Sequence, residues 1–485
     1  MFGDRFVKKN ALWLNKFIAL KKVAFQRITY STTPYFYATI QKKLNRVMKT
    51  IMKRLFLVCG ASVMCVVTTS AQQLSQEDSN PVKMGWMQGF PPMDNMVVEA
   101  ADGSFFNFPA LRYTVCNMRQ FVPTKVVKCA TTDRYRFREA IDPGIEKIQF
   151  VPMFETEPVG WQAFLDKNYV DGVIILHKGK IVYEKYQGAL KPDGTHSVMS
   201  VSKTFTGTLG AILVAEGVLD ENKLVKEYVP ELAQSAFGDA TVRNLLDMTT
   251  ALKYSEDYSD PNSDIWEYSA AGNLQKPEGY KGAMYYYQYL EKIKKSGEHG
   301  KRFAYKTVNT DALGWVISRA TGKSIPDLLS EKIWVPMGAN YDGYYQVDPR
   351  GIAFAGGGFN ANLRDLAMFG EMVRRRGWFN GKQIMPEQVV DDILKNADNA
   401  RFDQESYPNL KGWGYRDMWW VTNNADKAFC ARGVYGQTIY IDMAAEMVLV
   451  RLASINAGCI ECRQRSVFTA RISGCGRLFN GKILI

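Results

Sequence analysis

A serine and a lysine three positions apart are the residues of this sequence best suited to chemistry. Ser200-Val201-Ser202-Lys203 is the one S-x-x-K in the chain, and it opens an apolar helical pattern that runs to about residue 217. Because positions i and i+3 share a helix face, Lys203 is expected beside the Ser200 hydroxyl. A buried lysine with a lowered pKa can take the serine proton, and a helix N-terminus favours a developing oxyanion. The motif therefore predicts a serine nucleophile.

Two other interpretations of this motif stay open. In the first, Ser200 is an ordinary N-cap and Lys203 is a solvated residue of the first turn. In the second, a histidine is the base, but the chain has only His177, His196 and His299, and none has a carboxylate at motif spacing. A G-x-S-x-G elbow is also missing around the serine, which disfavours a Ser-His-Asp triad.

Segments near the start and the end of the central region must position the Ser200 helix. Residues 172–186 and 437–454 each contain two β-branched and aromatic runs around a short turn, which predicts two β-hairpins. Residues 218–330 between them have helical patterns and polar loops. We therefore expect an α+β fold (an α/β sandwich): an antiparallel sheet built from N- and C-terminal parts and flanked by helices, with an inserted, mostly helical lobe. A cleft is expected where the two lobes meet.

Helix signals also stand at 159–166, 241–248 and 310–320, and from Asn362 to about residue 375. The spacing of Asn362 and Asp365 is typical of a capping box. The expected organisation is then as follows: 1–51 basic extension, 52–71 signal peptide, 72–145 N-terminal wrapping segment, 146–217 with 331–457 α/β lobe, 218–330 helical lobe, and 458–485 atypical tail.

The formal net charge of +12 belongs to the N-terminal segment. Residues 1–71 hold thirteen Lys/Arg and one acidic residue, so the remainder is neutral, which disfavours a nucleic-acid partner. A basic flank, the apolar run 55–68 and small residues up to Ala71 form a secretory signal pattern, and the run is shorter than the ~20 residues of a membrane span. We expect cleavage near Ala71, no stable membrane span, and a periplasmic or secreted bacterial protein. Translation starts at Met48 or Met52, or else residues 1–47 are a genuine extension.

The cysteines leave two alternatives open. In an exported protein Cys116 and Cys129 can pair across a short loop, or both can be free and buried. Cys459 and Cys462 form a C-x-x-C, but a second pair at zinc-ribbon spacing is missing from the sequence, so we expect no metal site there.

Five segments in order along the chain carry a family resemblance. They are HSVMSVSKTFTG (196–207), TVRNLLDMTTALKYSEDY (241–258), RFAYKTVNTDALGWVISRATGKS (302–324), AGGGFNANLRDLAMFGEMV (355–373) and GVYGQTIYIDMAAEMVLVRL (433–452). Together they resemble the penicillin-recognising serine hydrolases, in particular the class C β-lactamase-like branch with its esterases and 6-aminohexanoate-oligomer hydrolases. The resemblance implies the β-lactamase/transpeptidase-like fold, an acyl-enzyme on the serine, and neither metal nor organic cofactor.

The resemblance also implies roles for residues far from the motif. Tyr305 takes the place of the family's catalytic tyrosine, so that Lys203 and Tyr305 act as general base and acid for Ser200. The Ser200 N–H, with one from Gly433 or Val434, would form the oxyanion hole.

Substrate contacts are expected from three further residues, and two of them depart from the family pattern. Thr307 replaces the family's asparagine, and Ala431-Arg432-Gly433 stands where K-T-G or H-x-G is usual. Arg432 binds a substrate carboxylate or else is a surface residue, and Gln437 follows in an A-x-G-x-x-G-Q form that resembles the 6-aminohexanoate branch. The departures count against a β-lactamase or D-Ala-D-Ala peptidase.

Taken together, the sequence predicts an exported serine hydrolase that acts on a small-molecule ester, amide or lactam. A catalytically inactive binding protein on the same scaffold is the alternative, and the missing triplet motivates it. Glu256, Asp257 and Asp260 lack the spacing of a calcium loop, so we expect solvated charges there. Trp419 and Trp420 should point to opposite faces of a strand, so that one can line the cleft, while packing in the core is the default interpretation of both.

Overall fold

A computed structural model describes residues 74–100, 104–152, 155–258, 260–276 and 278–456, and the backbone of 470–472 and 483–484. The chain divides into two units between Gln72 and Gln73, and the description below concerns the second. The expected extension and signal peptide, and most of the expected tail, lie outside the described residues. Those predictions stay predictions.

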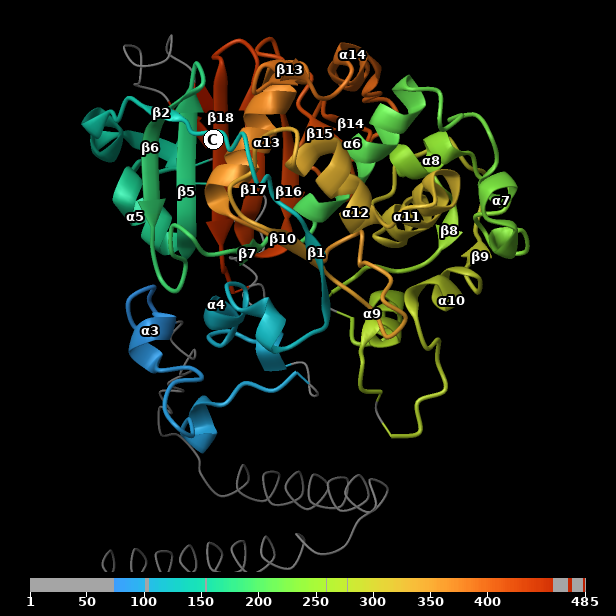
Figure 1. The fold of residues 1–485 in the computed structure, drawn as a ribbon, viewed down its shortest axis with the longest axis horizontal. Coiled ribbons are helices and arrows are strands. Elements are labelled where there is room, and N and C mark those ends of the chain that lie inside the picture. The colour runs from blue at the N-terminus through green and yellow to red at the C-terminus, as the bar shows by residue number, and fades with distance from the viewer. Residues whose placement is uncertain are drawn as a thin grey trace, which may run out of the picture. The chain divides into compact units, whose positions relative to one another are not determined.

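The largest sheet in the described part of the chain has eight strands in the order β14-β15-β16-β17-β18-β5-β6-β2 (Figure 1). The two expected hairpins are β5 (Val170–His177) with β6 (Lys180–Tyr186), and β17 (Gln437–Asp442) with β18 (Met447–Ala453). They join at the centre, where β18 runs antiparallel to β5. The α+β fold with an antiparallel sheet from both ends of the chain is thus confirmed. The other strands are β2 (Arg138–Glu139), β14 (Gly414–Arg416), β15 (Trp419–Val421) and β16 (Phe429–Gly433).

Helix α13 (Leu363–Arg374) packs across β5, β17 and β18, and α5 (Trp161–Lys167) packs against β5. Asn362 caps α13 by accepting from the Arg364 N–H, as expected. The reciprocal half of the predicted capping box is absent from this turn. Asp365 instead accepts hydrogen bonds from the backbone N–H groups of Asn340 and Tyr341, because a buried carboxylate takes the donors that the loop before β10 presents.

The helical lobe lies beside the sheet on the α6 side (Figure 1). Its central helix α11 (Val308–Thr321) packs against α6 (Val201–Ala215) and α8 (Val242–Leu246), and Thr241 caps α8 in a box with Asn244. The other elements are α7 (Val225–Tyr228), η5 (Pro230–Leu232), β8 (Leu252–Lys253), α9 (Asp264–Gly272), α10 (Tyr286–Leu290), β9 (Lys294–Lys295), α12 (Ile325–Leu329) and η6 (Ser330–Trp334).

A second, four-stranded sheet in the order β1-β10-β11-β7 leads the chain into α6. Its members are β1 (Thr124–Val127), β10 (Gly343–Gln346), β11 (Phe359–Ala361) and β7 (His196–Ser197). Because Ser197 pairs with Asn360 and α6 begins four residues later, this sheet sets the position of the Ser200 turn. Smaller elements complete the body: η4 (Pro143–Lys147), β3 (Gln149–Pro152), β4 (Val159–Gly160), β12 (Trp378–Phe379), β13 (Lys382–Gln383), α14 (Glu387–Asn396), η7 (Val434–Gly436), β19 (Ala470–Ile472) and β20 (Ile483–Leu484).

The described residues before β1, 74–100 and 104–123, include the short helices α3 (Pro81–Met84) and α4 (Leu111–Thr114). Arg112 of α4 is fully buried and pairs with Asp171 of β5 at 3.3 Å. The same guanidinium donates to Ser454 after β18 and to Ser79 near α3. One buried arginine therefore joins this segment to β5 and to the end of β18. Asp171 compensates its charge, and the serine hydroxyls accept further hydrogen bonds from it.

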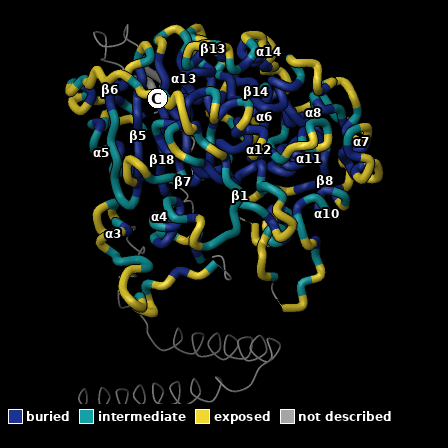
Figure 2. The backbone as a smooth tube through the Cα atoms, viewed as in Figure 1, coloured by how far each residue is buried: buried dark blue, intermediate teal, exposed yellow. Residues whose placement is uncertain are grey.

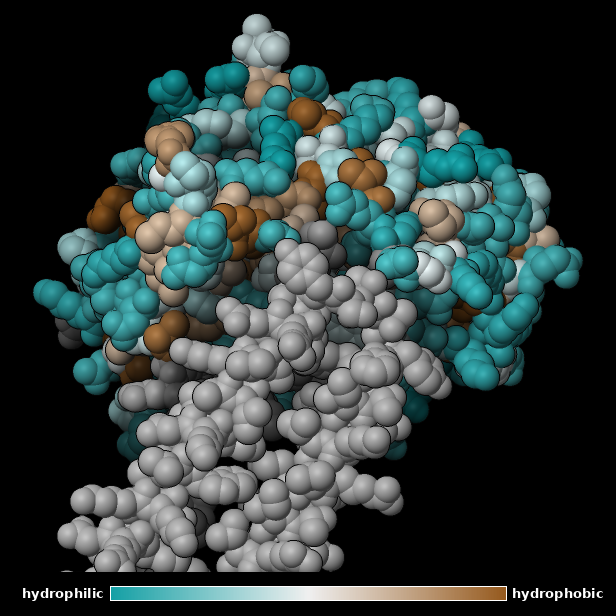
Figure 3. All heavy atoms as spheres, turned by 90° about the horizontal axis from the view of Figure 1, so that it is seen from below, coloured by the Kyte–Doolittle hydropathy of each residue, from teal (hydrophilic) through white to brown (hydrophobic). Residues whose placement is uncertain are grey.

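Burial follows this architecture. The tube in Figure 2 is dark blue through β5, β18, α6 and α13 and largely yellow around α3, so the interior lies between the central sheet and its helices. Hydrophilic side chains predominate on the face drawn in Figure 3, with small separate hydrophobic patches. Cys116, Cys129 and Cys430 are free thiols, so the disulfide considered for the first two is not formed. Within the described residues, every helix is too short or too polar to cross a bilayer.

Candidate active site

The turn from β7 into α6 places Ser200 at a helix N-terminus. Met199, just before it, has a left-handed backbone with φ of 48°, a conformation that is costly for a residue with a side chain. Its side chain is held in a buried cluster with Leu111 and Val115. Ser200 occupies the N-cap position, but its side chain makes no capping hydrogen bond. The hydroxyl is thus left available for another partner.

That partner is Lys203. Its Nζ donates to Ser200 Oγ at 3.0 Å and to the Gly356 carbonyl oxygen at 2.6 Å, and the side chain is buried. Burial lowers the pKa of Lys203 to about 8, although the charges of Glu256 and Asp311 act in the opposite direction. Lys203 is therefore not a solvated residue of the first turn. Its amine is buried next to the serine, and the pKa of this amine is lowered to about 8.

Tyr305 joins the pair from the segment before α11. The Lys203 Nζ lies 5.0 Å from the centre of its ring, and its hydroxyl shares a hydrogen bond with Ser200. Burial, followed by the charge of Glu256, raises the pKa of the Tyr305 phenol, while the Ser200 hydrogen bond and the charge of Arg432 lower it. The structure thus brings Ser200, Lys203 and Tyr305 together, with the phenol protonated at neutral pH.

Gly433 at the end of β16 approaches the Ser200 turn very closely. A Cβ atom on this glycine would lie 2.7 Å from the Val198 carbonyl oxygen and 3.1 Å from the Ser200 nitrogen, which any larger residue would have to displace. The backbone hydrogen bonds between elements of the described part of the chain include none from the Ser200 N–H. This N–H and that of Val434, the residue after Gly433, stay the expected oxyanion donors.

Two of the residues expected at the substrate are engaged within the protein instead. Thr307 is buried and directs both its N–H and its hydroxyl to Glu256. Gln437 is also buried, and its amide exchanges two hydrogen bonds with the backbone of Ala453 in β18 and donates a third to Val434. Their polar atoms thus join the start of β17 to β18 and η7, and the segment before α11 to Glu256.

Arg432 differs from these two. Its guanidinium lies 4.8 Å from the ring centre of Trp420 and 5.9 Å from that of Trp413. Its Nη1 is buried and has no hydrogen-bond partner among the described residues, and burial lowers the pKa of the group. A buried guanidinium nitrogen without an acceptor is costly, so this position favours an external anion.

The two adjacent tryptophans lie on opposite faces of β15, as expected. Trp420 lies 5.5 Å from the Tyr305 ring and 5.3 Å from the Tyr415 ring, and these three rings form the aromatic wall of the site. Trp419 faces the other way, where its Nε1 donates to Thr208 of α6 and its ring stacks on Phe369 of α13. One tryptophan thus serves the site and the other the core.

Sequence reasoning missed Glu256, and the expectation of a solvated charge there is wrong. Its Oε2 accepts from the Thr307 N–H at 2.6 Å, and its Oε1 accepts from the Thr307 hydroxyl at 2.5 Å and the Tyr258 hydroxyl at 3.0 Å. Thr307 lies 51 positions away, so no local spacing marks its contact with Glu256. Asp257 and Asp260 are exposed, as expected.

The histidines do not provide a base for the serine. His196 is buried between Asp171 and the Ser197 carbonyl oxygen. His299 lies between Asp239 and the Ala251 N–H. The hydrogen bonds found for Ser200 among the described residues go to Lys203 and Tyr305, so the Ser-His-Asp alternative has no geometric support.

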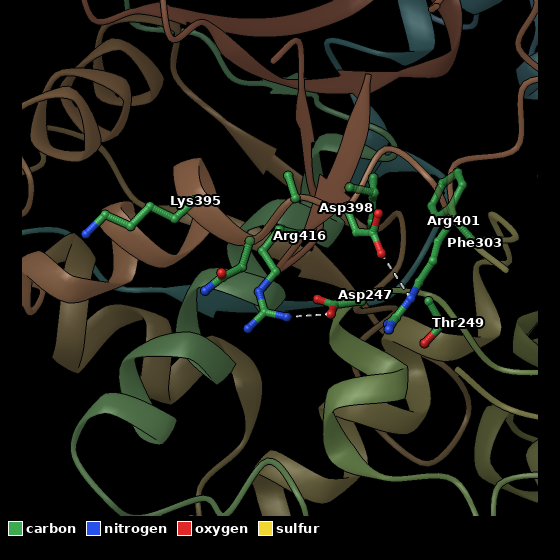
Figure 4. A pocket seen from close by; sticks show the side chains of 10 residues that line it. Asp247, Thr249, Phe303, Lys395, Asp398, Arg401 and Arg416 are labelled. Carbon is green, nitrogen blue, oxygen red and sulfur yellow. Dashed lines mark hydrogen bonds and ion pairs between the residues drawn. The ribbon is translucent and has the colours of Figure 1, made fainter. Parts of the chain in front are cut away.

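A separate hollow of about 510 Å³ is lined by ten residues, among them Asp247, Phe303 and Arg416 (Figure 4). Phe303 and Tyr415 line it and also pack around Trp420. Its charged rim is largely paired internally, by Arg416 with Asp247 at 2.7 Å and by Arg401 with Asp398 at 3.2 Å. None of the predicted site residues lines this hollow, so we treat it as distinct.

Comparison with known proteins agrees with this geometry. The family model described as Beta-lactamase matches residues 166–458. A 6-aminohexanoate-dimer hydrolase of Paenarthrobacter ureafaciens is 32% identical over 292 residues, which are 60% of this chain and 74% of that protein. A β-lactamase of Providencia stuartii is 42% identical over 57 residues, or 12% of this chain and 15% of that one. The solved structure of a putative 6-aminohexanoate-dimer hydrolase from Bacillus anthracis has a TM-score of 0.70 at 31% identity and covers 77% of this chain and 95% of its own.

Proposed function

The chain belongs to the β-lactamase family of serine hydrolases, and from this premise we propose that it cleaves a small-molecule amide or ester through an acyl-enzyme on Ser200. The observation that carries the proposal is the buried Lys203 amine, which donates to Ser200 Oγ at 3.0 Å and has a pKa of about 8. A serine hydroxyl is a weak nucleophile until a base takes its proton, and Lys203 is a base of suitable strength at the right distance.

The reaction follows from these positions. Ser200 Oγ bonds to the substrate carbonyl carbon while its proton passes to neutral Lys203, and the N–H groups of Ser200 and Val434 receive the negative oxygen. Tyr305 donates a proton to the leaving nitrogen or oxygen as the old bond breaks, and Lys203 restores the phenol. Water then attacks the acyl carbon, its proton returns along the same path, and Ser200 is released with the carboxylic acid product.

Arg432 supports a substrate that carries a carboxylate. Its Nη1 is unpartnered among the described residues and its guanidinium lies near two tryptophan rings, so an anion would complete the hydrogen bonding and apolar groups of the substrate would meet the rings. Linear amides of amino acids have such a carboxylate, and the names of the relatives from Paenarthrobacter ureafaciens and Bacillus anthracis give the 6-aminohexanoate dimer as their substrate. We place this chain's substrate in the same class, ahead of β-lactams and D-Ala-D-Ala peptides.

Two experiments test the chemistry. A fluorophosphonate probe should label wild-type protein, and mass spectrometry should locate the label on the peptide that contains Ser200. Turnover of p-nitrophenyl esters, a chromogenic cephalosporin and the 6-aminohexanoate dimer should then be compared between wild type and Ser200→Ala. Turnover that survives the substitution would reject the mechanism.

Binding without turnover is the second candidate, and Ala431 in place of the usual lysine or histidine favours it. The same probe separates the candidates, because a folded wild-type protein that remains unlabelled at Ser200 and still binds the dimer would be a binding protein.

We also propose that the mature protein is exported, on the strength of the signal pattern that ends at Ala71. N-terminal sequencing of protein from the periplasm or medium should start close to Gln72. A full-length chain that stays with the cytosol would contradict export without affecting the chemistry.

A further inference from the structure

The turn that follows β8 reaches the active site through a single carboxylate. Glu256 accepts hydrogen bonds on both oxygens from Thr307, the residue that precedes α11. Thr307 stands two positions after Tyr305, so the carboxylate holds the short segment from which the phenol projects. A charge-assisted bond from each of two donors on one residue fixes both its backbone and its side chain.

The turn itself is anchored, so that Glu256 does not merely follow Thr307. The Ser255 N–H donates to the Asp264 carboxylate at 2.7 Å, the Ser255 carbonyl accepts from Ile265, and Ser255 Oγ accepts from Ser263 at 2.9 Å. These contacts tie the residue before Glu256 to the start of α9. The Glu256 carboxylate is therefore held in place relative to the start of α9 and binds the residue that precedes α11.

The charge of Glu256 also acts on both proton-carrying residues of the site. It opposes the effect of burial on the pKa of Lys203, and it adds to the effect of burial on the pKa of Tyr305. The other groups that face Lys203 are Ser200, the Gly356 carbonyl oxygen, the Tyr305 ring and the Asp311 carboxyl, whose own pKa burial raises to about 7.

Glu256 faces other ionisable groups as well. Thr307 and Tyr258 donate hydrogen bonds to it, and its charge acts to raise the pKa of Lys306 and of Tyr254. Lys306 donates to the Leu252 carbonyl oxygen, and burial lowers its pKa. Lys306 therefore does not replace the Thr307 donors that hold the carboxylate.

We propose that Glu256 is a positioning residue of the active site, whose carboxylate fixes the segment that carries Tyr305 and whose negative charge acts on Lys203. This inference rests on the proposed function, since it concerns the proton transfers that activate Ser200. It assigns two separable effects to one side chain, one on the maximal rate and one on its dependence on pH.

The pH dependence of fluorophosphonate labelling tests the second effect. Glu256→Gln keeps the size of the side chain but removes the charge that favours protonated Lys203. The pH at half-maximal labelling should therefore fall by about 1 unit. At pH 6.5 the variant should then retain a larger share of its maximal rate than wild type does. Asp257→Asn, which removes the same charge from the next, exposed position, should reproduce the wild-type profile.

Substitutions of Thr307 test the first effect. Thr307→Val removes the hydroxyl donor while the carboxylate stays, so the maximal labelling rate should fall about tenfold with the half-maximal pH unchanged. Thr307→Ser retains the donor and should restore the rate.

The outcomes separate this inference from the proposed function. If the rate of labelling at Ser200 does not change with pH and is the same in Lys203→Ala as in wild type, the proposed function fails and this inference fails with it. If labelling depends on Lys203 but Glu256→Gln and wild type share one half-maximal pH, only the inference about Glu256 is overturned. A lower maximal rate with an unshifted profile would likewise reduce Glu256 to a structural role.

Discussion

Two cations flank the aromatic wall of the site, and they differ in how completely the protein satisfies them. Lys203 donates to Ser200 Oγ and to the Gly356 carbonyl oxygen, both within the protein. Arg432 lies against Trp413 and Trp420 and leaves a buried nitrogen without an acceptor among the described residues. Burial lowers the pKa of both groups.

The difference separates chemistry from recognition. A cation whose hydrogen bonds are complete inside the protein has no need of substrate, so Lys203 is suited to move a proton over a fixed distance. A cation with an unfilled position gains most when an anion arrives, so Arg432 is suited to choose between substrates. The comparison predicts that changes on the Lys203 side affect all substrates alike and that changes on the Arg432 side depend on substrate charge.

The largest effect is expected from Lys203→Ala. Without the base, kcat/KM should fall about 10³-fold for the 6-aminohexanoate dimer and for neutral p-nitrophenyl esters alike. Steady-state kinetics on both substrates, with thermal melting to show that the variant is folded, would measure it. A loss confined to the charged substrate would remove the distinction between the two cations.

Gly433→Ala should have the next largest effect. The new methyl group would meet the Val198 carbonyl oxygen and the Ser200 nitrogen, so β16 must move and one oxyanion donor moves with it. We expect about a 10²-fold loss of kcat for all substrates. Gly160→Ala, at a glycine with open space around it and, like Gly433, a negative φ, is the matched control for the added methyl group. Equal losses in the two variants would argue against the oxyanion hole.

Arg432→Gln should discriminate between substrates. KM for carboxylate-bearing amides should rise about 10- to 100-fold, because a charged hydrogen bond is lost, while kcat/KM for neutral esters changes little. Parallel losses on both substrate types would show that Arg432 acts in the chemical step instead.

The smallest effect is the pH dependence of the wild-type protein. The acylation step needs neutral Lys203, whose pKa is lowered to about 8, so the neutral fraction falls as the pH drops below that value. The rate of fluorophosphonate labelling should rise about tenfold from pH 6 to 7 and level off above about 8. A rate that falls over this range would contradict the assignment of Lys203 as the base.

Local patterns explain why part of the site was predictable from the sequence. The apolar run after Ser200 and the two hairpins are short-range signals, and the structure has them as α6, β5–β6 and β17–β18. The proximity of Lys203 to Ser200 follows from helix geometry alone.

The remaining features depend on contacts between distant segments. Glu256 meets Thr307 across 51 positions, and Asp365 takes the Asn340 and Tyr341 donors in preference to its own helix end. The Gln437 side chain forms hydrogen bonds with the backbone of Ala453 in the next strand, although its place in the A-x-G-x-x-G-Q form suggested a role at the substrate. Side-chain direction in these cases is decided by which buried backbone groups need a partner, and spacing along the chain does not reveal that.

The close approach of Gly433 to the Ser200 turn has a consequence for the order in which the chain folds. Ser200 and Lys203 lie at the start of one helix, but Gly433 belongs to β16, which joins the first hairpin only through β17 and the pairing of β18 with β5. Such non-local pairing requires closure of a long loop, which makes it slow and late. We therefore expect Ser200 of a newly made chain to become reactive toward an acyl donor only in the final stage of folding, so that this reactivity reports on the completion of folding.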